Sequence, residues 1–274
     1  MAISNYLPTV WHASLLENLH QNTFIIPTLN RDYEGDIVNG GESVKITGFT
    51  QPTIGTYSGT ITRQAMTDST QTLAIDQQKY YAYLVDDVDR VQAAGSFDAV
   101  QVDAGAGLAD VAEDFVMTTM LAGGTSAGTA AVTTAALADA AVVAIRTGLV
   151  KAKVPSAQRY LGVNPEAAAL LMGSGTSLFK ANESGSDATL RNGVIGQYRG
   201  FTVIETPSAA IANTARPCFI GYWGRAFAFV DQLVQQRANP ALDAFGDQID
   251  GLHVYGGKVL RATAVQTYVA AAPA

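Results

Sequence analysis

Apolar and polar residues alternate with a period of two in two early stretches, ESVKITGF (residues 42–49) and TQTLAID (residues 70–76). This alternation, together with many threonines, is typical of strands. The stretch between them, QPTIGTYSG, contains Pro52, Gly55 and Gly59, which suit the tip of a loop. We therefore predict a long β-hairpin within residues 41–85. A two-stranded ribbon is marginally stable alone in water, so it should lie on a partner or on another part of the chain.

A helical pattern follows. Apolar residues recur at i, i+3, i+4 and i+7 from Leu108 to Phe115 and predict a long amphipathic helix within residues 86–121. Asp86 would lie near its start, where carboxylates interact favourably with free backbone amides. Gly105 and Gly107 would weaken its middle and allow a bend. A second helix is predicted over residues 137–150.

Strand and helix patterns are interleaved in the rest of the chain. Residues 159–163 predict a strand, after which Asn164 is placed to cap a helix that has Pro165 at its first position. Further strands are predicted at residues 218–221 and 226–230. The fold class is therefore α+β.

Near the C-terminus, two β-rich runs flank the dipeptide Gly256-Gly257 in GLHVYGGKVL. Glycine tolerates the positive φ angles of a two-residue type I′ turn. We therefore predict a β-hairpin that turns at Gly256-Gly257.

Charge is scarce and unevenly distributed. Charged residues make up 15% of the chain, against about a quarter in a typical soluble domain. A surface with little charge suggests contact with other protein, although the many alanines also raise the apolar fraction. Residues 1–145 carry 16 acidic and 5 basic residues, whereas residues 146–274 carry 8 acidic and 12 basic residues. The two halves could meet between subunits, face each other within one subunit, or lie in water.

No pattern of residues indicates catalysis, a metal or a cofactor. The three histidines are far apart, the HExxH, CxxC and GxSxG motifs are absent, and Cys218 lies in an apolar setting typical of a buried thiol. Basic residues do not cluster beyond Lys151 and Lys153, which argues against sequence-specific binding of nucleic acid. Neither a signal peptide nor a membrane span is apparent.

Two stretches, LRNGVIGQYRGF and GLHVYGGKVL, resemble the major capsid proteins of tailed double-stranded-DNA bacteriophages, the Hong Kong 97-like family. The order of the predicted elements resembles this family along nearly the whole chain. The resemblance implies an N-terminal arm (1–40), an extended β-hairpin loop (41–85), and a peripheral subdomain with a long spine helix (86–158). It further implies an axial subdomain (159–235) and a return to the peripheral sheet (236–274).

The resemblance also implies a function. A non-enzymatic subunit of this family self-assembles into hexamers and pentamers of an icosahedral capsid, so the protein is expected in the virion after synthesis in the host cytoplasm. Implied partners are further copies, a separate scaffolding protein, a portal, and packaged double-stranded DNA bound without sequence specificity. The family's extended loop reaches over a neighbour, which makes its tip a candidate intersubunit contact: Pro52, Thr53, Ile54, Gly55, Thr56 and Tyr57.

Some family members cross-link a lysine of this loop to a neighbouring subunit, but QPTIGTYSG has no lysine. We therefore expect no such cross-links. Two alternatives remain open at this point. One is an encapsulin-type compartment, which shares the fold and encloses protein cargo; the other is a β-rich adhesion or receptor-binding module that uses the threonine-rich ribbon for contact.

Overall fold

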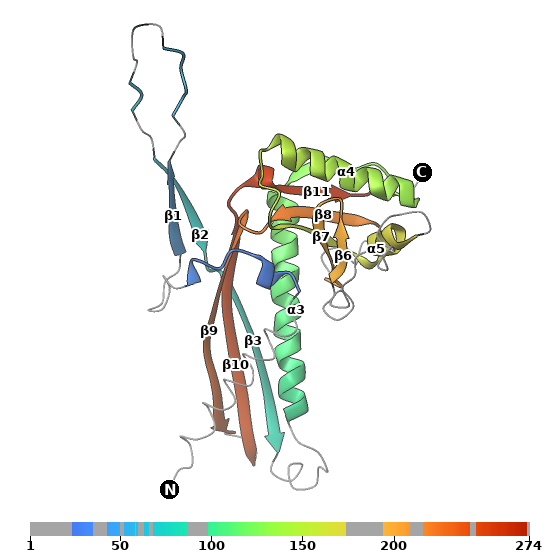
Figure 1. Ribbon diagram of the computed structural model, residues 1–274. Helices are drawn as coiled ribbons and strands as arrows, with labels where there is room; N and C mark the ends of the chain where they lie inside the picture. The colour runs from blue at the N-terminus through green and yellow to red at the C-terminus, as the bar shows by residue number, and fades with distance from the viewer. Residues whose placement is uncertain are drawn as a thin grey trace.

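The computed structural model describes residues 24–34, 43–49, 52–57, 59, 63–65, 68–86, 98–173, 194–208, 216–241 and 245–272 of the 274-residue chain. Figure 1 shows a two-stranded ribbon that projects from the body, a sheet that lies along one long helix, and a second sheet beside a shorter helix. Helices and strands are interleaved along the chain, which confirms the predicted α+β class.

The projecting ribbon consists of β1 (Ser43–Phe49) and β2 (Asp68–Ala74). They pair antiparallel, with Ser43 opposite Ala74 and Phe49 opposite Asp68. This confirms the predicted hairpin, although it ends earlier than expected. The following strand, β3 (Gln77–Asp86), lies in the predicted hairpin range but joins a different sheet.

A three-stranded antiparallel sheet has the order β3–β10–β9, with β9 at Phe227–Pro240 and β10 at Gly246–Val259. The long helix α3 (Asp98–Gly123) lies along this sheet (Figure 1). Leu108 and Ala109 of α3 are buried with Tyr81 of β3 packed against them. The predicted spine helix is thus present.

The expected start of α3 is wrong, and its glycines do not break it. Asp86 is the last residue of β3, opposite Gly246 of β10, and the helix begins only at Asp98. The strand extends this far because its β-rich sequence pairs with β10 along its whole length. The helix also continues through Gly105 and Gly107. Each glycine costs about 1 kcal/mol relative to alanine, and the packing of α3 on the sheet offsets that cost.

The second sheet has six strands in the order β4–β11–β8–β5–β7–β6. The central strands are β11 (Val265–Val269), β8 (Cys218–Trp223), β5 (Arg159–Val163) and β7 (Phe201–Glu205), and the edges are β4 (Thr125–Gly128) and β6 (Val194–Tyr198). The strands predicted at residues 159–163 and 218–221 are confirmed, and that predicted at 226–230 forms the start of β9, whereas β4 was not predicted.

Two helices accompany this sheet, α4 (Ala135–Lys151) and α5 (Pro165–Met172). Thr134 caps α4, and Asn164 caps α5 by accepting a hydrogen bond from the Ala167 amide at 3.0 Å. The helix predicted over 137–150 and the Asn164-Pro165 helix start are both confirmed. The described residues also include two 3-10 turns, η1 (Ile26–Thr28) and η5 (Ala262–Ala264).

The predicted turn at Gly256-Gly257 is wrong. Both glycines lie inside β10, where Gly256 pairs with Val230 and Gly257 with Phe229 of β9. Neither has a positive φ angle. The first apolar run, the glycine pair and the start of the second run therefore form one strand, β10. The rest of the second run forms η5 and β11. The physical reason for the glycines is close approach of neighbouring chain segments, described below.

The predicted segment boundaries also do not follow the two sheets. Helix α4 falls within the 86–158 segment but packs on the six-stranded sheet, where Ile145 lies over Gly221. The boundary after residue 235 falls within β9, and β11 pairs with β8 and β4 instead of returning to the three-stranded sheet. Four of the five β11 residues are buried, and a strand buried on both faces requires a central position in a covered sheet.

The main core lies between the six-stranded sheet, α3 and α4. The last part of the predicted arm contributes to it: Ile25, Ile26 and Leu29 are buried there. Asn30 also forms a bridge with Ala228 of β9. Residues 1–23 of the predicted arm lie outside the described residues.

Candidate subunit interface

All six candidate tip residues of the extended loop are exposed. Ile54 is 89% exposed and Tyr57 is 72% exposed, so the most protruding part of the ribbon presents two large apolar side chains to solvent. The Thr53 amide donates a hydrogen bond to Gln64 Oε1 at 3.0 Å, which links the two sides of the loop. Exposed apolar side chains on a projecting ribbon are suited to contact with another protein.

The root of this ribbon is fixed to the body. Leu73 and Ile75 are buried in a small apolar cluster with Ala228 and Val230 of β9. Side chains add two hydrogen bonds: Gln71 Nε2 donates to the Leu260 carbonyl at 3.2 Å, and Lys258 Nζ donates to the Thr72 carbonyl at 2.9 Å. The ribbon therefore projects from an anchored base.

Gly256 and Gly257 lie at this root. A Cβ atom added to Gly256 would be 2.2 Å from the carbonyl oxygen of Ala74 and 2.8 Å from Cα of Ile75. A Cβ atom on Gly257 would be 2.8 Å from the Phe227 ring. The glycine pair thus allows the chain leaving β2 to cross β10 closely. A glycine within a strand pattern can signal such an approach.

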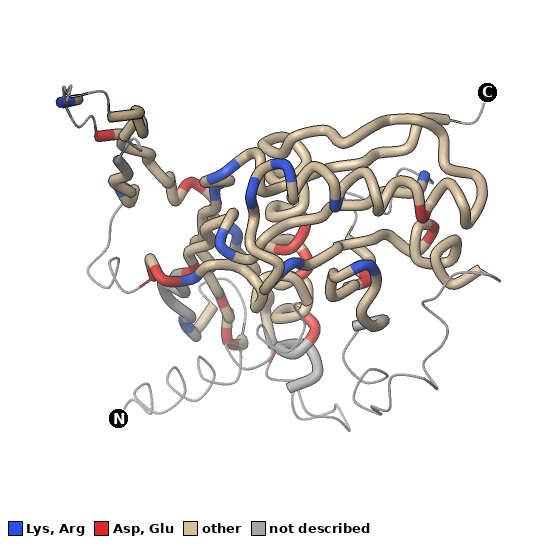
Figure 2. The backbone as a smooth tube through the Cα atoms, turned by 45° about the horizontal axis from the view of Figure 1, so that its top comes forward, with Lys and Arg blue, Asp and Glu red and all other residues tan. Residues whose placement is uncertain are grey.

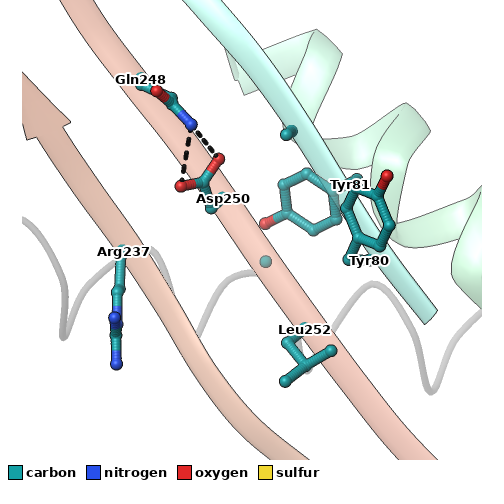
Figure 3. A pocket seen from close by; sticks show the side chains of 8 residues that line it. Tyr80, Tyr81, Arg237, Gln248, Asp250 and Leu252 are labelled. Carbon is teal, nitrogen blue, oxygen red and sulfur yellow. Dashed lines mark hydrogen bonds between the residues drawn. The ribbon is translucent and has the colours of Figure 1, made fainter. Parts of the chain in front are cut away.

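Within the part of the chain that the structure describes, one face of the three-stranded sheet is left uncovered, and we call it the open face. Side chains alternate along β3, so Tyr80 and Leu84 point away from α3 and are 78% and 50% exposed. Leu252 lies opposite Tyr80, and Asp250 lies opposite Ala82. Around the small Ala82 the face has a hollow of about 480 Å³ (Figure 3). Gln248 Nε2 donates to both carboxylate oxygens of Asp250 at its border, at 2.9 and 3.1 Å.

Glu113 of α3 links three segments of the chain. Its carboxylate accepts hydrogen bonds from the Phe24 amide at 3.0 Å and from the Thr206 hydroxyl, which follows β7. The neighbouring Asp114 accepts a hydrogen bond from the Ser208 hydroxyl at 2.5 Å. Burial raises the pKa of the Glu113 carboxyl, and its hydrogen bonds offset part of that rise. This carboxylate positions the arm and the six-stranded sheet on the long helix.

Asp231 of the three-stranded sheet pairs both with a buried histidine of that sheet and with an arginine of the arm. His253 of β10 is 1% exposed, and its Nε2 lies 2.6 Å from Asp231 Oδ1 of β9. Arg31 lies 3.6 Å from the other oxygen of Asp231 and also pairs with Glu34. Of the three histidines, His253 therefore has a structural role; His12 and His20 lie outside the described residues.

The two-residue turn expected at the glycine pair occurs instead between β6 and β7. Tyr198 pairs with Phe201, and the residues between them, Arg199 and Gly200, have φ angles of 52° and 85°. Arg199 is held in this unusual conformation by two hydrogen bonds to Asp139 of α4, at 3.0 and 2.7 Å. Burial raises the pKa of the Asp139 carboxyl, but the hydrogen bonds from Tyr198 and Arg199 outweigh it and lower the pKa overall.

The described residues do not assemble a reactive centre. They contain no group of three or more His, Cys, Asp or Glu side chains that could hold a metal ion. Cys218 is buried, and burial raises the pKa of its thiol to about 12. In the same part of the chain, no helix has the length and apolar character needed to cross a membrane.

Comparisons with known proteins identify the family. A family model described as phage capsid protein matches residues 67–268. A solved chain from Mycobacterium phage Che8 is 36% identical, with a TM-score of 0.78 and 90% of each chain covered. No sequence among the curated proteins matches significantly.

More distant structures share the fold. The capsid structure of cyanophage P-SCSP1u is 17% identical with a TM-score of 0.67, and 85% of each chain is covered. A virus-like particle from Pyrococcus furiosus is 11% identical with a TM-score of 0.62, covering 96% of this chain and 99% of the other.

The family match spans both sheets and α3, and it rules out the adhesion module and excludes an enzymatic role. The resemblance read from LRNGVIGQYRGF and GLHVYGGKVL is confirmed, and both stretches lie within the matched residues. The chain belongs to the phage capsid protein family and has the Hong Kong 97-like fold.

Proposed function

We propose that this protein is the shell subunit of an icosahedral phage capsid, and that its copies form hexamers and pentamers around double-stranded DNA. The observation that carries the proposal is the anchored ribbon with an exposed apolar tip, Ile54 and Tyr57, in a member of the capsid family. Such a tip gains stability only when another molecule covers it. Closed symmetry lets one chain use the same patches in every copy.

The tip of one copy lies on the open face of the three-stranded sheet of a neighbour. This face supplies exposed apolar side chains, Tyr80 and Leu84, and a hollow of about 480 Å³ beside them. The tip is uncharged from Pro52 to Tyr57, so it brings apolar surface without the cost of burying an unpaired charge. The loop-tip residues are therefore intersubunit contacts in this proposal.

The proposal includes two subdomains, and the two larger sheets support this division. The peripheral one comprises the three-stranded sheet and α3, and the axial one comprises the six-stranded sheet with α4 and α5. A scaffolding protein and a portal are further partners, because a closed shell needs a guide to its size and an entry point for DNA. Packaged DNA is enclosed without sequence-specific contacts.

Negative-stain electron microscopy of the expressed protein, alone and with a coexpressed scaffolding protein, tests this function. We expect uniform closed shells or ring-shaped capsomers that hold nucleic acid after packaging. Shells that enclose a protein cargo and no nucleic acid in infected cells would instead favour the encapsulin-type compartment. A stable monomer under all conditions would overturn the proposal.

A further inference from the structure

One end of the six-stranded sheet carries a basic surface. It comes from the end of α4, the start of β5, the turn between β8 and β9, and the segment after β10. Its side chains are exposed except for the partly buried Arg159. We define the basic surface by these six residues: Arg146, Lys151, Lys153, Arg159, Arg225 and Arg261.

Strand pairing, a cation–π contact and backbone hydrogen bonds bring these segments together. Arg159 lies opposite Trp223 in the β5–β8 register, and the guanidinium of Arg261 lies 5.9 Å from the centre of the Trp223 ring. The Gly224 amide donates to the Gln158 carbonyl at 3.1 Å, and the Arg261 amide donates to the Ala226 carbonyl at 3.3 Å. Arg225 lies between Gly224 and Ala226 in sequence, so these two hydrogen bonds place it between the segments that carry Arg159 and Arg261. Figure 2 shows Lys and Arg positions gathered in this part of the fold.

The charge of this surface is not offset by its own segments. Residues 140–165, 207–230 and 251–274 contain no Asp or Glu. Burial and then the charge of Arg146 lower the pKa of the Arg159 guanidinium, which indicates mutual repulsion of the cations. A surface of this kind favours an anionic partner.

The long helix α3 has the opposite character. It contains five carboxylates and no Lys or Arg. Asp103, Asp110 and Asp114 are spaced by seven and four residues and therefore share one face of the helix. Asp103 and Asp110 are exposed, and Gly107 between them has open space where a side chain would be. Burial and the charge of Asp114 raise the pKa of Asp110, so the anions on this face also repel each other.

We propose that the basic surface of one copy docks onto the acidic face of α3, defined by Asp103, Asp110 and Asp114, in a second copy of this chain. The inference rests on the proposed shell function. Each copy carries both halves of the contact, so the pairing repeats head to tail around a ring. Complementary charge of this kind sets the register and the partner more than the affinity.

A second copy fits the basic surface better than packaged DNA. Its complement, a helix face without a single cation, is present on the same chain. The protein has a net charge of −7, so two copies repel each other overall. Contact between the basic surface of one copy and the acidic face of another offsets part of this repulsion. DNA binding to the same cations is the competing outcome of the test.

The test is a charge-reversal cycle in the full chain. Lys151→Glu with Lys153→Glu reverses part of the basic surface, and Asp103→Lys with Asp110→Lys reverses the acidic face. We expect each pair alone to lower the yield of shells at physiological salt by about tenfold and the four substitutions together to restore it. Lys79→Glu, at an exposed position of β3, is the control for a change of charge alone. Circular dichroism melting of each unassembled subunit checks that it is folded.

The outcomes are separable. If the unaltered protein forms no shells, the proposed function fails before the cycle can begin. If it forms shells and every folded variant assembles equally well, the docking inference is overturned. Normal assembly combined with loss of DNA retention in the Lys151/Lys153 variant would also overturn it and assign the surface to DNA. Failure of the fourfold variant to recover, with both pairs folded, counts against a direct contact.

Discussion

The carbonyl oxygen of Ala74 lies so close to Gly256 that a Cβ atom on Gly256 would be 2.2 Å from it. Ala74 is the last residue of the ribbon strand β2, and Gly256 lies within β10. The lack of a side chain at Gly256 therefore allows the chain at the base of the extended loop to pack directly against β10. A contact that narrow involves backbone on both sides and cannot be relieved by rotating a side chain.

Replacing Gly256 by alanine should destabilise the subunit by about 2–3 kcal/mol, because the added methyl group overpacks against the backbone of Ala74. Chemical denaturation of the unassembled subunit measures the change. Gly107→Ala is the matched control: that site in α3 is open, and the substitution should stabilise the helix by about 1 kcal/mol. Equal effects of the two substitutions would contradict the crossing of β2 and β10.

Glu113 should make stability fall as pH rises. Burial raises its pKa above the ordinary value of 4.5 in the folded protein. Between these two pKa values the folded state binds more protons than the unfolded state, so raising the pH through this window costs stability. In Glu113→Gln this titration is absent, so the difference in unfolding free energy between the two proteins should change in that window and be constant at lower pH. Urea denaturation from pH 3 to pH 8 provides the measurement; a constant difference throughout would rule out a raised pKa.

The loop tip should matter for assembly and not for folding. Ile54→Ser combined with Tyr57→Ser removes two side chains that are 89% and 72% exposed in the subunit. The melting temperature of the subunit should therefore be unchanged, while the yield of shells, measured by sedimentation, should fall about tenfold or more. Thr56→Ser at the same tip serves as the control. A normal yield of shells from the double variant would show that Ile54 and Tyr57 do not form contacts needed for assembly.

Cys218 should be unreactive in the folded protein. Burial raises its thiol pKa to about 12, so the nucleophilic thiolate is scarce at neutral pH. A thiol-specific colorimetric reagent should label it slowly in the native state and rapidly in denaturant. Rapid labelling of the native subunit at pH 7 would show that the strand carrying Cys218 opens readily.

Assembled shells should dissolve into single chains in hot detergent. The described tip has no lysine, and the lysines of the extended loop, Lys45 in β1 and Lys79 in β3, lie towards its base. Isopeptide cross-links through the tip are therefore not expected. Electrophoresis of shells boiled in detergent tests this prediction, because a ladder of covalent oligomers would reveal cross-links.

Several elements could be predicted from residues close together in sequence, with no knowledge of the tertiary structure. The alternation around residues 42–49 and 70–76 predicted the ribbon, because successive side chains of a strand point to opposite faces whether or not the strand lies on the core. Asn164 followed by Pro165 predicted the start of α5, because capping depends on residues adjacent in sequence. The stretches LRNGVIGQYRGF and GLHVYGGKVL pointed to the capsid family, which the comparisons confirm.

Contacts between distant segments decided the rest. Gly256-Gly257 is compatible in sequence with a turn or with a close crossing, and only the approach of Ala74 selects the crossing. Arg199-Gly200 forms the two-residue turn because Asp139, from α4, holds Arg199 at positive φ. The sequence by itself thus determined the strand and helix patterns and the family. Which strands share a sheet, and why glycine occupies β10, depended on tertiary packing, because both are set by residues far apart in the chain.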